Sequence, residues 1–228
     1  MFTGFPQATI DYFMNLRFNN YTSYYEQTKD VFIKDVRTPF FQFIEAMASA
    51  MQKIDPFMEV RPQKCLARIR RDTRFTKDKA PFRDNLWLLF RRAAEPKDNS
   101  VMYWFELSPD DVAWGLGFWG ENRNAMDTLR RQMTSKPDAF LKVIEQCQLE
   151  KNQFALSGEA FKRLPIPDSL PPSLHSWYVK KQLYLPKQGL KMQDAFSKDL
   201  VDRVSKDFTL LAPLYRAFRG CVEETTEA

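Results

Sequence analysis

Apolar residues recur at three- and four-residue spacings near the start of the chain and again after residue 122. This spacing puts apolar side chains on one face of an α-helix. It predicts helices in residues 1–56, helices in residues 122–148 and a C-terminal helix in residues 197–220. Because Pro39 and Pro213 interrupt two of these patterns, each should bend its helix or divide it in two.

The middle of the chain, residues 60–120, has the pattern of β-strands. Its apolar runs are short, rich in aromatic residues and separated by turn-forming residues: Leu66–Arg71, Leu86–Arg92, Met102–Leu107 and Ala113–Trp119. The sequence Ser-Pro-Asp-Asp at 108–111 predicts a hairpin between the last two runs. Residues 150–186 are rich in proline, which predicts an irregular stretch with an edge strand from Tyr178 to Leu185.

Strands that follow one another directly, with helices before and after them, are typical of α+β proteins. We therefore expect a single α+β domain over residues 1–228. Its centre should be an antiparallel β-meander of four or more strands, with N-terminal and C-terminal helices packed against it. The length of 228 residues and the 44% share of hydrophobic residues are sufficient for one core.

The cysteine and histidine content argues against several kinds of site. The cysteines Cys65, Cys147 and Cys221 form no CxxC pair, and His175 is the single histidine. These residues predict neither a disulfide framework nor a zinc ribbon nor a His-based metal site. We predict no metal and no cofactor, and a buried, unreactive thiol at Cys65.

The N-terminal residues do not have the pattern of a secretory signal peptide. No apolar run reaches the ~18 residues that a membrane-spanning helix needs. We therefore expect a cytoplasmic protein without a membrane partner. The sequence does not indicate an oligomeric state.

Positive charge is concentrated in residues 61–83. This segment has nine lysines and arginines against two aspartates, a local charge of +7 in a chain whose net charge is +5. The rest of the chain is therefore slightly acidic. Concentrated positive charge attracts phosphate, carboxylate or nucleic acid.

The order of residues within this segment suggests a site at the end of a strand. A regular strand would put Arg71 on the same face as Ile69, so pairing should end or bulge near Arg71-Asp72. The bend would direct the following loop towards a common centre, where aspartates could orient guanidinium groups. The candidate ligand-binding residues are Arg68, Arg71, Asp72, Arg74, Asp78 and Lys79, with Arg123 and Lys181 as outer members.

Four interpretations of this cluster are open. It is a structural clamp, a site for a small anionic or phosphate-containing ligand, a nucleic-acid or acidic-protein interaction surface, or the centre of an enzyme that acts on a phosphorylated substrate. In the enzyme, Asp72 or Asp78 would be the base. We favour the small ligand over nucleic acid because the interleaved aspartates would repel an extended phosphate backbone.

The same segment carries a recognisable motif. Residues 68–82 have the form RxxRDxRFxxDKxP followed by an aromatic residue. The chain thereby resembles a widespread bacterial family, with fungal relatives, of about this length and known as a conserved domain of unknown function. The resemblance continues in blocks over nearly the whole chain, at Asn19-Asn20 and Lys29, from Met102 to Trp119, at Arg123, at Leu156–Glu159 with Lys162-Arg163, and at Trp177 with Lys180-Lys181.

This resemblance implies an α+β architecture and supplies no activity, substrate or partner. The chain departs from the family pattern at Phe82, where the family usually has tyrosine. A phenolic hydroxyl at this position can therefore have no role in this protein.

Overall fold

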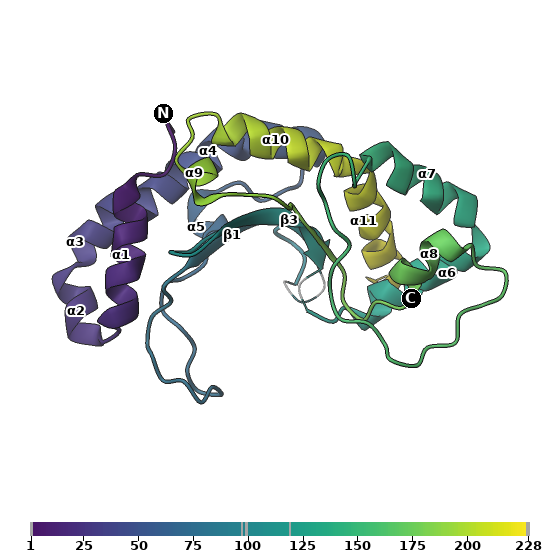
Figure 1. Ribbon diagram of the computed structural model, residues 1–228, viewed down its shortest axis with the longest axis horizontal. Coiled ribbons are helices and arrows are strands. Elements are labelled where there is room, and N and C mark those ends of the chain that lie inside the picture. The colour runs from purple at the N-terminus through teal and green to yellow at the C-terminus, as the bar shows by residue number, and fades with distance from the viewer. Residues whose placement is uncertain (1, 97, 99, 119, 227–228) are drawn as a thin grey trace. The chain divides into compact units, whose positions relative to one another are not determined.

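Helices precede and follow a four-stranded antiparallel sheet in the computed structural model of the chain (Figure 1). The structure describes residues 2–96, 98, 100–118 and 120–226, so Trp119, the expected end of one run, lies outside the described residues. The strands are β1 (Leu86–Phe90), β2 (Val101–Leu107), β3 (Val112–Phe118) and β4 (Tyr184–Pro186), in the order β1-β2-β3-β4 across the sheet. The predicted α+β class and antiparallel meander are confirmed.

The chain divides into two compact units. The first contains the residues up to Phe90, Trp104–Ala113 and Leu190–Ser205, and the second contains Arg91–Tyr103, Trp114–Gly189 and the residues from Lys206 onward. The basic segment, residues 61–83, belongs to the first unit.

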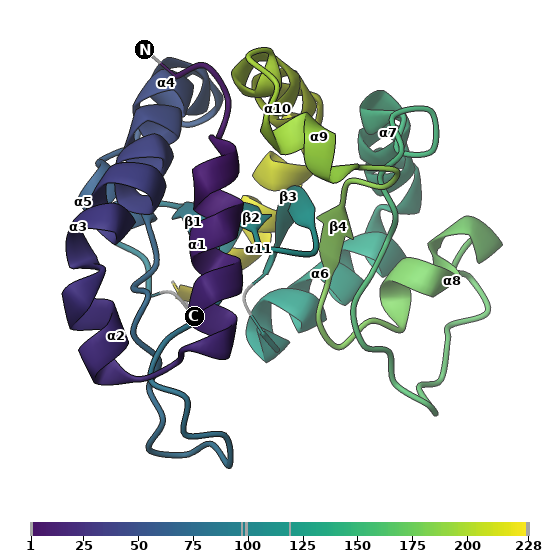
Figure 2. The ribbon, with the colours of Figure 1, turned by 60° about the vertical axis from the view of Figure 1, so that its left-hand side comes forward.

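The first unit begins with the helices that the spacing of apolar residues predicts. They are α1 (Gln7–Phe18), α2 (Thr22–Gln27), α3 (Lys29–Val31), the π-helical turn η1 (Phe32–Arg37) and α4 (Thr38–Ile54). In both views α1 lies alongside α2 and α3 (Figure 1; Figure 2). Buried aromatic rings fill the core of this unit. The ring of Phe105 stacks on Phe5 with centroids 5.6 Å apart and lies 4.8 Å from that of Phe43.

Pro39 bends the helical run without interrupting it. Proline has no N–H to donate to the carbonyl four residues earlier, and that carbonyl, on Asp35, accepts a hydrogen bond from the Thr9 hydroxyl instead. The turn before Pro39 widens into η1, where the Thr38 hydroxyl donates to the Ile33 carbonyl five residues back at 2.8 Å. A π-helical turn of this kind is one of the recognised ways in which a helix accommodates a bend.

The prediction of a strand at Leu66–Arg71 is wrong. Residues Pro62–Cys65 form the short helix α5, and the following residues pair at isolated positions only, Leu66 with Leu88 and Arg70 with Phe82. The last backbone hydrogen bond runs from the Arg71 N–H to the Pro81 carbonyl, at 2.9 Å. Because Pro81 has no N–H to return, pairing stops there, which agrees with the expectation that it ends near Arg71.

The second unit contains α6 (Arg123–Ser135), α7 (Pro137–Cys147), α8 (Pro172–Tyr178) and α11 (Ala212–Thr226). Its core also consists largely of rings, with Tyr103 4.7 Å from Phe208 and 5.2 Å from Tyr215 between centroids. None of the helices in the described part of the chain combines the length and the apolar character that a membrane crossing requires.

The expected edge strand from Tyr178 to Leu185 is shorter than predicted. Tyr178 is the last residue of α8 and does not belong to a strand. The helix begins at Pro172, and proline is well accommodated in the first turn of a helix. Strand β4 pairs with β3 through Leu116 and Leu185, and isolated bridges such as that from Ser157 to Tyr184 cover its other side. These bridges protect what would otherwise be an open sheet edge.

The C-terminal helix is divided, as Pro213 predicts. Helix α10 (Leu200–Leu210) is followed by α11, in which Pro213 is the second residue and needs no N–H donor. The predicted limits of 197–220 are wrong at both ends, since α10 begins at Leu200 and α11 continues through Gly220 to Thr226.

Candidate functional site

A loop from Arg71 to Pro81 carries most of the candidate residues. Two backbone hydrogen bonds of 2.9 Å close its base, from the Arg71 N–H to the Pro81 carbonyl and from the Arg83 N–H to the Ile69 carbonyl. The loop extends past the ends of α1 and α2 in both ribbon views (Figure 1; Figure 2). We call residues 71–81 the basic loop.

Hydrogen bonds within the basic loop fix its shape. The Arg71 and Arg74 guanidinium groups form ion pairs with Asp78 and Asp72, the second with a separation of 2.7 Å. The Lys79 ammonium donates to the Thr73 carbonyl at 2.8 Å. The expected clustering of arginine and aspartate is therefore present, but as local pairs.

These pairs lie at the surface. The Arg74 and Asp72 side chains are 76% and 56% exposed, and ion pairs in such positions contribute little to stability. The interpretation as a buried structural clamp is therefore not supported for this pair.

The aspartates of the basic loop are poor candidates for a general base. The Arg74 guanidinium and the Arg74 backbone N–H lower the pKa of Asp72 to about 2. The pKa of Asp78 is also lowered, first by the Ala80 N–H and then by Arg71. A catalytic base works best with a pKa near the operating pH, so neither carboxylate is suited to proton abstraction at neutral pH.

A pocket of about 570 Å³ opens beside the basic loop. Arg71, Asp72 and Asp78 line it from the loop, and Arg17, Asn20 and Arg83 are among the residues that line it from elsewhere in the first unit. We call it the loop pocket.

Side chains from α1 and the turn after it support the loop pocket. The Asn20 amide bonds both polar groups of the Phe82 backbone, accepting from its N–H and donating to its carbonyl, each at 2.9 Å. The Arg17 guanidinium forms ion pairs with Asp84 and Asp110. These bonds join residues about sixty positions apart in the chain. They hold in place the side of the loop pocket that Arg17 and Asn20 line.

Arg83 is the distinctive group in the loop pocket. Its guanidinium donates to the carbonyls of Arg68 and Arg70, at 3.3 and 2.7 Å, and lies 4.7 Å from the centre of the Trp87 ring. Burial lowers the pKa of Arg83, and the nearby positive charge of Arg71 lowers it further.

Arg83 has no carboxylate partner among the described residues, whereas Arg17 and Arg71 are paired. The Arg71 guanidinium lies close enough to lower the pKa of Arg83, so the two positive charges repel each other. An anion bound at both would relieve this repulsion.

The other candidate residues are less central. Arg68 is exposed and does not line the loop pocket. Arg123 and Lys181 belong to the second unit, where both line a pocket of about 320 Å³ and form ion pairs with Glu121 and Glu159, at 3.6 and 3.8 Å. Their participation with the basic loop in one site stays a prediction.

The sequence does not single out Arg17 or Asp84 as site residues. Arg83 belongs to the basic segment and Asn20 to a block of the family resemblance, but neither is among the candidate residues predicted above. No local pattern marks the bonds from Asn20 to Phe82 or from Arg17 to Asp84, because each spans more than sixty residues of sequence.

Cys65 and His175 each contact a backbone carbonyl nearby in the chain. Cys65 is buried, and its thiol donates to the Glu59 carbonyl at 3.2 Å. The His175 ring nitrogen Nε2 lies 3.0 Å from the Leu170 carbonyl. Neither residue lines the loop pocket.

Comparison with known proteins identifies the family. A comparison with curated proteins gave no match. The sequence model of the conserved hypothetical proteins DUF2461 matches residues 8–216, nearly the whole chain. As the resemblance in the sequence indicated, the chain belongs to the DUF2461 family of conserved hypothetical proteins.

Proposed function

We propose that the loop pocket binds a small anionic ligand, such as a phosphate monoester, through Arg71 and Arg83. The observation that carries this proposal is Arg83, which has no carboxylate partner among the described residues and whose pKa is lowered by burial and by Arg71. A phosphate group offers several acceptor oxygens to two such guanidinium groups.

The dimensions and charge of the loop pocket favour a small ligand. Its volume of about 570 Å³ lies within the range of roughly 300–1,000 Å³ for small-molecule sites. Asp72, Asp78 and Asp84 also line it and would repel additional phosphates. These aspartates favour a ligand with one anionic group and a neutral polar body.

Calorimetric titration with glucose 6-phosphate tests the proposal. We expect Arg71→Gln and Arg83→Gln each to weaken binding roughly 10- to 100-fold, since a hydrogen bond to a charged group contributes about 1.5–3 kcal/mol. The matched control is Lys77→Gln, which removes an exposed cation of the basic loop that does not line the pocket. An equal effect of all three substitutions, or no binding by the unaltered chain, would refute the proposal.

Phe75 favours a second candidate function, binding of single-stranded nucleic acid. Its side chain is 91% exposed at the tip of the basic loop, and the Arg74 guanidinium carbon lies 5.5 Å from its ring centre. Exposed aromatic rings next to arginines stack on bases in single-stranded binding proteins.

The sequence-based expectations of an acidic-protein partner and a cytoplasmic location stay predictions.

Salt dependence separates the two candidates. A surface that neutralises several phosphates of a single strand loses affinity steeply with salt, with a log–log slope of about −0.7 per phosphate. We expect binding of an oligonucleotide to be undetectable or weak, and Phe75→Ala to leave the affinity for glucose 6-phosphate unchanged. Tight oligonucleotide binding that Phe75→Ala abolishes would favour the second candidate.

A further inference from the structure

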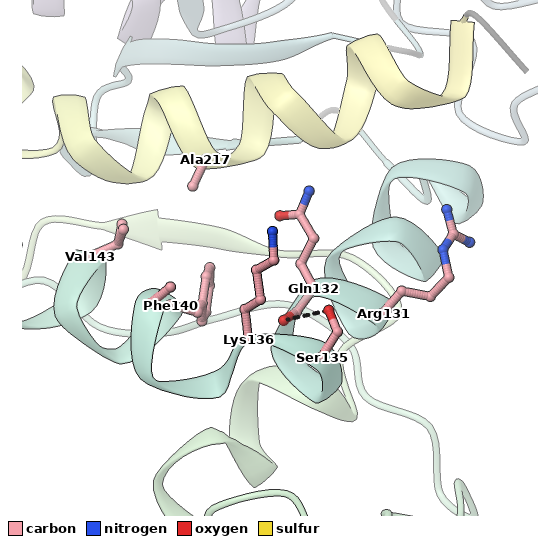
Figure 3. Close-up of a pocket in the computed structure, with 8 residues that line it drawn as sticks. Arg131, Gln132, Ser135, Lys136, Phe140, Val143 and Ala217 are labelled. Atoms are coloured by element: carbon pink, nitrogen blue, oxygen red, sulfur yellow. Dashed lines mark hydrogen bonds between the residues drawn. The ribbon is translucent and has the colours of Figure 1, made fainter.

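A second pocket, of about 420 Å³, lies among α6, α7 and α11 in the second unit. Figure 3 shows Gln132 and Lys136 rising from the end of α6 and the junction with α7 towards Ala217 on α11, with Phe140 and Val143 at the side. Because helices α6, α7 and α11 surround it, we call it the helix pocket.

One side of the helix pocket is apolar and fixed. Phe140 is buried, and its ring packs edge-on against Trp177 with the centroids 5.6 Å apart and the planes at 84°. Val143 continues this surface along α7. Ala139 and Ala217 have short side chains, which leave the space between their helices unfilled.

The other side of the helix pocket is basic. Arg131 and Lys136 line it, and no described aspartate or glutamate does. The Arg131 guanidinium donates a hydrogen bond to the Thr128 hydroxyl at 2.7 Å. It forms no ion pair with any described residue. The Lys136 ammonium is exposed and likewise has neither an ion pair nor a hydrogen bond within the described part of the chain.

This composition differs from that of the loop pocket, in which three aspartates lie among the arginines. Net positive charge without a carboxylate favours an anion. A rigid apolar wall beside it favours a ligand with a hydrophobic body. The two properties together select for molecules that have both parts.

We propose that the helix pocket binds a small amphipathic carboxylate, an aliphatic or aromatic acid with a short apolar body. The carboxylate contacts Lys136, which Figure 3 shows between Gln132 and the apolar side chains. The apolar body packs against Phe140, Val143 and Ala217, and Arg131 adds positive charge at the other end of the pocket. This site uses no residue of the loop pocket, so its occupancy and the proposed function of the loop pocket are tested independently.

Three probes separate the contributions to binding: octanoate has both parts, octanol has only the apolar body, and acetate has only the carboxylate. Each is titrated into the full chain while backbone amide resonances are followed by NMR. We expect octanoate to shift amides around Lys136, Phe140 and Ala217. It should bind roughly tenfold or more tightly than octanol, because a charge-assisted hydrogen bond alone accounts for about that factor. It should also bind more tightly than acetate, because acetate has no apolar body to bury.

Substitutions then test which positive charge contacts the carboxylate. Lys136→Gln should weaken octanoate binding roughly tenfold or more, because it removes that charge-assisted hydrogen bond. The matched control, Lys142→Gln, removes an exposed lysine of α7 that does not line the helix pocket and should leave the affinity unchanged. Ala217→Leu should fill the space and abolish binding, with the amide spectrum of the free variant verifying that it folds.

Several results would overturn the proposal. Equal affinities for octanoate and octanol would show that the cations contribute nothing. Equal effects of Lys136→Gln and Lys142→Gln would show general attraction of the anion. Shifts confined to amides outside α6, α7 and α11, or no shift with any probe, would exclude the helix pocket as a site.

Discussion

Two kinds of aspartate in this protein illustrate how burial decides the role of an ion pair. Asp72 pairs at the surface with Arg74, two residues away in sequence. Asp207 is buried, where it accepts hydrogen bonds from the Trp114 indole at 2.9 Å and from the Lys187 ammonium at 3.1 Å. The second arrangement is buried, as a structural clamp requires, and it lies in the second unit.

Replacing these aspartates should therefore have different consequences. Asp207→Ala leaves the largely buried Lys187 ammonium without its carboxylate and should lower the free energy of unfolding by about 3–5 kcal/mol. Asp72→Ala is the surface control and should leave that energy nearly unchanged. Urea denaturation measures both, and comparable losses for the two variants would contradict this assignment.

The pKa of Asp72 gives a second prediction. The neighbouring Arg74 lowers it to about 2, so the ion pair is fully formed above the ordinary carboxyl pKa of about 3.9 and is lost as the pH falls through about 2. NMR titration of the Asp72 carboxyl carbon should show this midpoint, and Arg74→Ala should return it towards the ordinary value. A midpoint near 4 in the unaltered chain would mean that the pair does not form in solution.

At the scale of elements, the spacing of apolar residues identified α1, α4, α6 and α7 because each has an apolar face that is buried in the fold. Local patterns do not predict a strand correctly where its hydrogen-bonding partners lie farther along the chain. The run Leu66–Arg71 has the composition of a strand, yet it pairs at isolated positions, and its partner segment includes Pro81.

The attachment of the basic loop to the turn after α1 can be tested directly. Asn20→Ala removes both side-chain hydrogen bonds to the Phe82 backbone and should cost about 1–3 kcal/mol of stability, because these partly buried groups lose their partner. Hydrogen exchange of the Phe82 amide should become faster, since local opening costs less.

Asn19→Ala is the matched control for this experiment. The Asn19 amide donates to the Asn15 carbonyl one turn back, at 3.0 Å and in an exposed position. Its loss should change neither the exchange of the Phe82 amide nor the loop pocket. If both variants accelerate exchange equally, the Asn20 amide is not what holds the loop base.

At the scale of the whole molecule, the sequence was sufficient for the α+β class and for the family, because both depend on features distributed along the entire chain. It located the basic segment but not the loop pocket. That pocket depends on Arg17 and Asn20, which contact residues 84 and 82 across more than sixty positions. A single sequence contains no signal for such pairs.

The proposed function of the loop pocket requires that Arg71 and Arg83 bind one anion together. The most direct test follows the side-chain Nε–Hε resonances of the arginines by NMR during titration with inorganic phosphate. We expect the Arg83 and Arg71 resonances to shift together with a single saturating affinity, while that of Arg68, which lies outside the loop pocket, stays unchanged. Uniform, non-saturating shifts of all three resonances, or no shift at Arg83, would show that the two arginines do not share one anion.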